Sequence, residues 1–144
     1  MEGEIIPNNQ RITITPGASA PFKLNGSSLP QCDVCFPVLH GPNGEDGTIQ
    51  GLLKLLKVPF VGSGVMSSSM TMDKEITKRL LVSAGIKVAL GSVLHRHSSI
   101  PSYDQLSKEL GSTLFIKPAN MGSSVGVHRV TSQEQLDNGL ADAF

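Results

Sequence analysis

Apolar residues recur with the period of an α-helix in four stretches of the chain. In the first stretch the spacing is i, i+3, i+4, i+7, at Ile49, Leu52, Leu53 and Leu56. Asp46 is the predicted N-cap of this helix, and Pro59 ends it. The same period predicts helices over residues 73–84, 102–110 and 132–144. The last two begin with the capping-box sequences Ser-Tyr-Asp-Gln and Ser-Gln-Glu-Gln, which define their first turns.

Runs of apolar and β-branched residues predict strands around these helices. Residues 11–15 alternate between polar and β-branched side chains, which is typical of a short, half-exposed strand. Residues 33–39 are mostly apolar and indicate a buried parallel strand. Residues 58–64, VPFVGSG, indicate a short strand and a turn, and the other predicted strands cover residues 87–94, 114–117 and 125–130. Strands and helices in this order predict an α/β fold.

The last predicted helix runs into the final residue of the sequence. Leu136, Leu140 and Phe144 form its apolar stripe, and no C-cap residue follows them. A natural terminus rarely ends on a large apolar residue of a buried helix face. We therefore expect the sequence to be a piece of a longer protein.

Charge and hydropathy exclude several classes of partner. Twelve basic and twelve acidic side chains cancel, so no charge excess indicates a nucleic-acid or membrane-surface partner. No apolar run approaches the roughly 18 residues of a membrane-spanning helix. The first residues, MEGEIIPNNQ, lack the basic start and apolar core of a secretory signal. The expected location is the cytoplasm.

Both cysteines lie close together, and their spacing raises a redox or zinc interpretation. Cys32 and Cys35 are followed by residues that read as strand, whereas a reactive Cys-x-x-Cys pair opens a helix. A structural zinc site needs about four ligands, and the chain has no second cysteine pair. Two reduced core cysteines are therefore the favoured interpretation, with a thiol redox or zinc protein as the alternative.

Two loops carry residue types suited to ligand binding. HGPNGEDG, residues 40–47, follows a predicted parallel strand, where open α/β sheets bind ligands. In the second loop Lys117 ends a strand before the glycine- and serine-rich residues 122–126, which can cover phosphates. By spacing alone this hairpin is about equally well explained as a plain glycine turn. Taken singly, His40 is more simply a structural histidine and Lys74 a solvated lysine.

Taken together, these segments resemble the D-alanine–D-alanine ligases. HGPNGEDGTIQG, residues 40–51, matches each defined position of a family pattern: His-Gly, two free positions, Gly-Glu-Asp-Gly, one free position, aliphatic, Gln or small, small. GLLKLLKVPFVGSGV, MDKEITKRLL and FIKPANMGSSVGV follow in the family's order. The resemblance covers roughly residues 30–144. It implies an ATP-grasp fold, in which two α/β domains clamp ATP between them.

The resemblance also implies a division into domains. Residues 1–63 are expected to form the C-terminal part of the N-terminal, substrate-side α/β domain with its parallel sheet. Residues 64–144 are expected to form most of the middle, nucleotide-covering α+β domain. The family's C-terminal catalytic domain, which holds the ligands of Mg²⁺ (or Mn²⁺), is expected to be absent, so no metal ligand is assigned in this chain. As an internal fragment of less than half the enzyme, the chain is expected to be inactive alone.

Individual roles follow from the same resemblance. His40, Glu45 and Ser123 are implied in the site where the first substrate is activated. Lys74 and Lys117 are implied to reach the ATP phosphates. The loop that folds over these phosphates comprises Gly122, Ser123, Ser124, Val125 and Gly126.

The implied reaction is carboxylate activation for peptidoglycan synthesis. ATP phosphorylates the carboxylate of one D-alanine, and the amine of a second D-alanine attacks the acyl phosphate to give the dipeptide. The transferring phosphoryl group needs charge neutralisation by lysines and metal. ATP and D-alanine are the implied partners, and the parent enzyme is expected to be a homodimer. Two alternatives stay open: a fragment of a D-alanine–D-lactate ligase, and a non-catalytic nucleotide-binding module.

Overall fold

Three short antiparallel strands open the described part of the chain, which comprises residues 10–144 of the computed structural model. β1 (Ile12–Ile14) pairs with β2 (Phe22–Leu24), and β2 pairs with β3 (Ser27–Ser28). The predicted strand over residues 11–15 is confirmed by β1. The second hairpin turns at Asn-Gly, and both residues have the positive φ that a two-residue hairpin turn requires.

The predicted buried strand over residues 33–39 is wrong. One isolated parallel bridge joins Cys35 to Phe60, and no longer ladder forms in this part of the described chain. Its apolar side chains are exposed, Phe36 by 70% and Val38 by 69%. A parallel strand is buried only when other elements cover both faces of its sheet. Within residues 10–144 this segment has a single short pairing partner.

α1 (Thr48–Leu55) confirms the first predicted helix. Its apolar stripe forms a core in which Leu53, Leu56 and Val58 are buried. The N-cap differs from the prediction by one residue, because Gly47 occupies that position with a left-handed backbone, φ 95°. Asp46 still acts on the helix start, since one of its carboxylate oxygens accepts the N–H of Thr48 at 2.9 Å.

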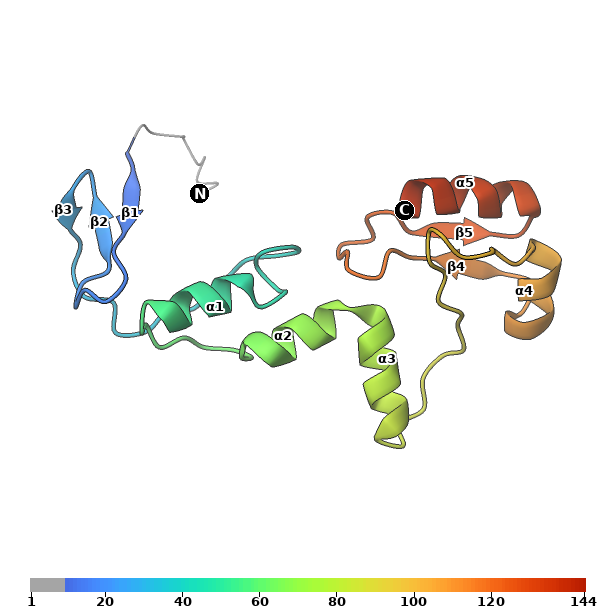
Figure 1. Ribbon diagram of the computed structural model, residues 1–144, viewed down its shortest axis with the longest axis horizontal. Helices are drawn as coiled ribbons and strands as arrows, with labels where there is room; N and C mark the ends of the chain where they lie inside the picture. The colour runs from blue at the N-terminus through green and yellow to red at the C-terminus, as the bar shows by residue number, and fades with distance from the viewer. Residues whose placement is uncertain (1–9) are drawn as a thin grey trace, which may run out of the picture.

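Two consecutive helices follow and meet at a corner (Figure 1). α2 (Val65–Met72) was not predicted, because VMSSSMTM has no apolar stripe. α3 (Lys74–Ser83) was predicted, and the Asp73 side chain caps it by accepting the N–H of Ile76 at 2.9 Å. The apolar stripe of α3 is only partly covered, and Leu80 is 47% exposed.

The second half of the described chain forms a separate α/β unit. α4 (Tyr103–Leu110) precedes β4 (Leu114–Ile116), which pairs antiparallel with β5 (His128–Val130) before α5 (Gln133–Ala143). α5 lies along this two-stranded sheet (Figure 1). These elements confirm four predictions. Their buried core consists of Leu106, Leu114, Val130, Leu136 and Leu140.

The predicted strand over residues 87–94 is wrong, because this segment forms no strand. Its carbonyl at Ala89 accepts a hydrogen bond from Lys78 Nζ at 3.0 Å rather than from a neighbouring strand. Leu90 is 80% exposed. A strand needs a ladder partner for its backbone groups, and within residues 10–144 none pairs with this segment.

The chain adopts an open arrangement. β1–β3 and α1 lie at one end, the unit of α4, β4, β5 and α5 lies at the other, and α2 and α3 connect them (Figure 1). The accessible surface is 10670 Å². A folded monomer of 144 residues typically exposes only about 7,100 Å². The described elements therefore form a mixed α/β structure with two small cores. No helix among residues 10–144 is long and apolar enough to cross a membrane.

Candidate functional site

The loop after Leu39 folds into a tight turn that carries His40 and Glu45. Glu45 Oε2 accepts the N–H of Gly41 at 2.6 Å, so the carboxylate points back across the loop. Gly44 lies so close to the preceding segment that a Cβ there would be 2.6 Å from the Cβ of Leu39. The sequence pattern therefore needs glycine at this position for close backbone approach.

Asp46 holds the second half of this loop. Its carboxylate oxygens accept the N–H groups of Asn43 at 2.8 Å and Thr48 at 2.9 Å. These backbone hydrogen bonds, that of Asn43 first, stabilise the charged form and lower the pKa of the Asp46 carboxyl. Gln50, buried in α1, donates Nε2 to the carbonyl of Gly44 at 3.2 Å. The loop is therefore fixed to the start of α1.

A cavity of about 290 Å³ lies beside this loop. It is lined by loop residues, among them His40, Pro42 and Gly44, and by Ile49 and Leu52 of α1. His40 is exposed. A concave, mainly apolar space with a few polar groups at its wall is the usual form of a small-molecule site.

The second predicted loop is a pair of consecutive turns. Val125 donates its N–H to the carbonyl of Gly122 at 3.1 Å, and Val127 donates to that of Ser124 at 3.3 Å. Ser123 and Ser124 have left-handed backbones, with φ of 51° and 60°. Each such residue costs about 1–2 kcal/mol outside glycine, and such conformations cluster at ligand sites.

The ends of this loop are anchored on both sides. A Cβ at Gly126 would lie 2.7 Å from Cγ of Pro118, so the loop closes on the residue after Lys117. Lys117 itself is exposed. On the other side, Lys74 Nζ donates to the carbonyls of Ala119 at 3.3 Å and Met121 at 2.5 Å.

The structure brings the two loops together at Glu45. A Cβ on Gly122 would lie 3.8 Å from Glu45 Oε2, which is ordinary van der Waals contact. Glu45 and Lys74 therefore both lie next to the start of the 122–126 loop. Among the hydrogen bonds of residues 10–144, none joins His40, Lys117 or Ser123 directly to another predicted site residue.

Ser69 was missed in the sequence although it connects α2 to the first loop. Its hydroxyl donates to the carbonyl of Asp46 at 2.7 Å. A Cβ at Gly47 would lie 2.7 Å from both Ser69 Oγ and the Val65 carbonyl oxygen. Ser69 is one of three consecutive serines in a segment without hydrophobic period, so the sequence does not single it out and only the contact identifies it.

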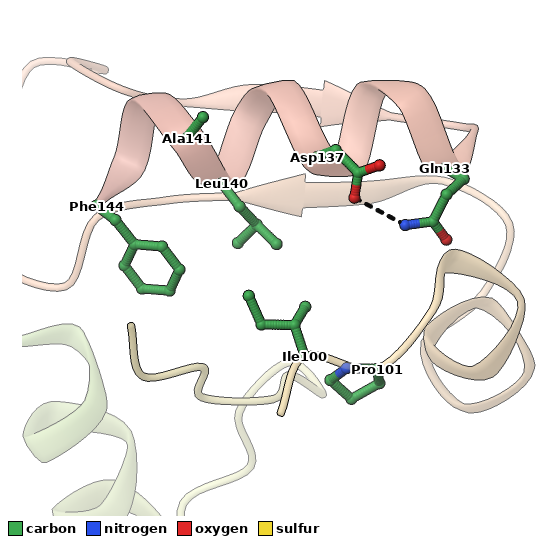
Figure 2. A pocket seen from close by; sticks show the side chains of 7 residues that line it. All are labelled: Ile100, Pro101, Gln133, Asp137, Leu140, Ala141 and Phe144. Atoms are coloured by element: carbon green, nitrogen blue, oxygen red, sulfur yellow. Dashed lines mark hydrogen bonds between the residues drawn. The ribbon is translucent and has the colours of Figure 1, made fainter. Parts of the chain in front are cut away.

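A second cavity, of about 330 Å³, lies away from the predicted site residues. Figure 2 shows it between α5 and the segment at Ile100 and Pro101. Leu140 and Phe144 supply apolar walls, and Gln133 donates to Asp137 at 2.9 Å at one end. None of the residues predicted to bind a ligand lines this cavity.

Comparison with protein families matches both halves of the chain. Residues 10–63 match the model described as D-ala D-ala ligase N-terminus, and residues 80–144 match D-ala D-ala ligase C-terminus. The D-alanine–D-alanine ligase of Oceanobacillus iheyensis is 47% identical over 143 residues, covering 94% of this chain and 38% of the relative. D-alanine–D-alanine ligase A of Escherichia coli K12 is 51% identical over 123 residues, covering 83% of this chain and 33% of the relative.

Solved structures of the same kind of enzyme are similar over nearly the whole chain. The D-alanine–D-alanine ligase of Coxiella burnetii superposes with a TM-score of 0.84 at 36% identity, covering 94% of this chain and 40% of that structure. A D-Ala:D-Ser ligase from Enterococcus faecalis gives a TM-score of 0.80 at 34% identity, covering 94% and 39%. This chain thus spans at most about two fifths of the length of these proteins.

Proposed function

Because this chain belongs to the D-alanine–D-alanine ligase family, we propose that it is part of an ATP-dependent ligase that joins two D-alanines. The reaction would proceed through a D-alanyl phosphate and supply a dipeptide for peptidoglycan synthesis. The chain spans well under two thirds of its relatives. We therefore propose further that these 144 residues do not catalyse ligation by themselves.

The meeting of the two loops is the observation that carries this proposal. A ligase of this kind must hold a carboxylate substrate and the phosphates of ATP within reacting distance. Glu45 from the first loop lies against Gly122 at the start of the second loop. The segment that would face the amino acid and the segment that would cover the phosphates thus share one site.

The residues of the second loop fit a polyphosphate. Ser123, Ser124 and Gly126 have left-handed backbones, and successive N–H groups in such turns can form anion-binding concavities. Lys117 is exposed beside the end of the loop and supplies a positive charge. Lys117 and this loop would bind the phosphates, and Lys74 would add a donor from α3. Hydroxyl groups of Ser123 and Ser124 can donate further hydrogen bonds.

The first loop fits the substrate side. His40 lines the cavity of about 290 Å³ and would face the D-alanine to be activated. Glu45 would orient this loop through its hydrogen bond to Gly41. Ser123 would complete the same substrate site from the opposite loop.

The described residues do not offer a metal ion a set of ligands comparable to the loops proposed for ATP and D-alanine. No group of three or more His, Cys, Asp or Glu side chains that could hold one occurs within residues 10–144. We therefore assign no step to Mg²⁺ or Mn²⁺ through residues of this chain.

The domain division is proposed along the same lines. Residues 1–63 would belong to the substrate-side domain and residues 64–144 to the nucleotide-covering domain. The first family-model match ends at residue 63, which supports the end of the first domain, and the second match begins at residue 80. A parent homodimer in the cytoplasm fits the same proposal.

D-alanine is the favoured second substrate. The curated relatives above are named D-alanine–D-alanine ligases, and one similar structure is a D-Ala:D-Ser ligase at lower identity. A D-lactate-forming ligase is not favoured by these comparisons.

ATP binding by the 144-residue chain tests the phosphate side directly. We expect Lys117→Met to weaken binding of ATP by about tenfold or more, because a hydrogen bond to a charged group contributes about 1.5–3 kcal/mol. Lys108→Met is the matched control, since it removes the same charge from an exposed position on α4. Isothermal titration calorimetry measures both.

Catalysis is tested on the complete native protein that contains this sequence. D-alanine-dependent release of phosphate from ATP is expected there and not with the 144-residue chain. Phosphate release by the short chain would contradict its proposed inactivity. ATP binding without any D-alanine-dependent turnover in the complete protein would instead support a non-catalytic nucleotide-binding module.

A further inference from the structure

The backbone N–H and the side-chain ammonium of Lys74 both donate hydrogen bonds to the turn that contains Ala119 and Met121. Its N–H donates to the carbonyl of Ala119 at 3.0 Å. Its ammonium donates to the carbonyls of Ala119 at 3.3 Å and Met121 at 2.5 Å. These partners lie 45 and 47 residues away in sequence, so the contact joins two distant segments.

The position of Lys74 on its helix makes these bonds informative. It is the first residue of α3, where the helix dipole disfavours a positive charge. Two carbonyl dipoles aimed at the ammonium offset this cost. The corner that carries Lys74 is itself braced, because Thr77 Oγ1 donates to the carbonyl of Met70 in α2 at 2.7 Å. A lysine anchored in this way can hold the turn at Ala119 and Met121 in place.

The partner is the turn that leads into the strained loop. Met121 immediately precedes Gly122, where an added Cβ would lie 3.8 Å from Glu45 Oε2, and the left-handed residues Ser123 and Ser124 follow. Left-handed serines persist only where surrounding contacts determine the backbone. The bonds from Lys74 to the carbonyls of Ala119 and Met121 are contacts of this kind on the N-terminal side of the loop.

We propose that Lys74 is a positioning residue, whose ammonium holds the carbonyls of Ala119 and Met121 and thereby sets the 122–126 loop against Glu45. The inference rests on the proposed function in one respect, namely that the 122–126 loop would bind the phosphates of ATP. An ammonium has three N–H donors, and two are used here. One donor is left for an anion, so positioning the loop and contacting a phosphate are compatible.

Hydrogen exchange without nucleotide tests the proposal. The amides of Val125 and Val127 are bonded within the loop and report its order. In the 144-residue chain, Lys74→Met removes all donors at nearly constant length, and exchange at these two amides is expected to rise about tenfold. Lys74→Arg keeps cationic donors and is expected to restore the rates to within about threefold of the unsubstituted chain. Amides of β4 and β5 should not change, which separates loop opening from global unfolding.

Lys78→Met is the matched control on the same helix. Lys78 also donates to a distant carbonyl, that of Ala89 at 3.0 Å. Loss of the Lys78 ammonium should leave the exchange rates of the Val125 and Val127 amides within about twofold of those in the unsubstituted chain. Unchanged exchange in Lys74→Met, or an equal rise in Lys78→Met, would overturn the inference. Because ATP is absent, failure of ATP binding would count against the proposed function and not against this positioning role.

Discussion

At the level of single residues, the first loop depends on the backbone of Gly47. Its φ of 95° is left-handed, and its Cα faces α2 so closely that no side chain fits. Ser69 uses this proximity to donate to the carbonyl of Asp46. One glycine thus permits both the turn into α1 and the contact between α1 and α2.

Gly47→Ala is expected to lower the free energy of unfolding by about 2–3 kcal/mol. The left-handed backbone accounts for about 1–2 kcal/mol, and the contact of the new Cβ with Val65 adds overpacking. Gly51→Ala is the control, because Gly51 lies inside α1 with no atom within 4 Å of an added Cβ. It should raise the stability by up to about 1 kcal/mol. Urea denaturation followed by circular dichroism compares the two, and equal effects would refute the contact.

Asp46 makes the first loop sensitive to acid. The pKa of its carboxyl is lower in the folded chain than its ordinary value of 3.8. A depressed pKa means that the contribution to stability is present above pH 3.8 and is lost as the pH falls through the folded value. We expect the amides of Asn43 and Thr48 to exchange faster as this carboxylate protonates. Asp46→Asn should abolish that pH dependence, which NMR can follow.

At the level of elements, the helix starts show how local sequence acts. In α4, Ser102 and Gln105 form both bonds of a capping box. In α5, Ser132 accepts the N–H of Gln135 as predicted, but the Gln135 side chain accepts from Thr131 rather than from the cap residue. The cap was predictable from neighbouring residues, whereas the reciprocal bond depended on the path of the chain leaving β5.

Ser102→Ala is expected to destabilise the unit containing α4 by about 1 kcal/mol, because an N–H in the first turn loses its acceptor. Ser107→Ala in the same helix is the control. Its hydroxyl only donates to the carbonyl of Asp104, and alanine has the higher helix propensity. Thermal unfolding of both variants measures the difference, and a smaller loss for Ser102→Ala than for Ser107→Ala would contradict the capping role.

At the level of the whole molecule, the described chain has two cores that share no residue. One surrounds Leu53 of α1 and the other surrounds Leu136 of α5. α2 and α3 connect them, and only Ser68 of these two helices is buried. Cooperative unfolding requires a common core. We therefore expect the two units to unfold separately.

Leu136→Ala should destabilise the unit of β4, β5 and α5 by about 2–5 kcal/mol, because it opens a cavity at a side chain that is only 1% exposed. Exchange rates of amides in α1 should stay unchanged. Leu53→Ala should destabilise the unit around α1 and leave the exchange rates of amides in β4, β5 and α5 unchanged. Residue-resolved hydrogen exchange in both variants is the measurement, and a parallel loss of protection in both units would show that they unfold together.

The sequence by itself determined the features that depend on near neighbours. These are the helices α1, α3, α4 and α5, the caps at Ser102 and Ser132, the pairing segments β4 and β5, and the family pattern over residues 40–51. Each arises from residues a few positions apart, where helical period, capping and turn chemistry act directly. The residue types of the candidate site were visible for the same reason.

Only the tertiary structure decided which distant segments meet. It left residues 33–39 exposed and residues 87–94 irregular, since neither has a ladder along its length within residues 10–144. It also placed Glu45 against Gly122 and bound Lys74 to the carbonyl of Met121. Such contacts join segments tens of residues apart, and their free energy depends on chain closure and packing rather than on local propensity.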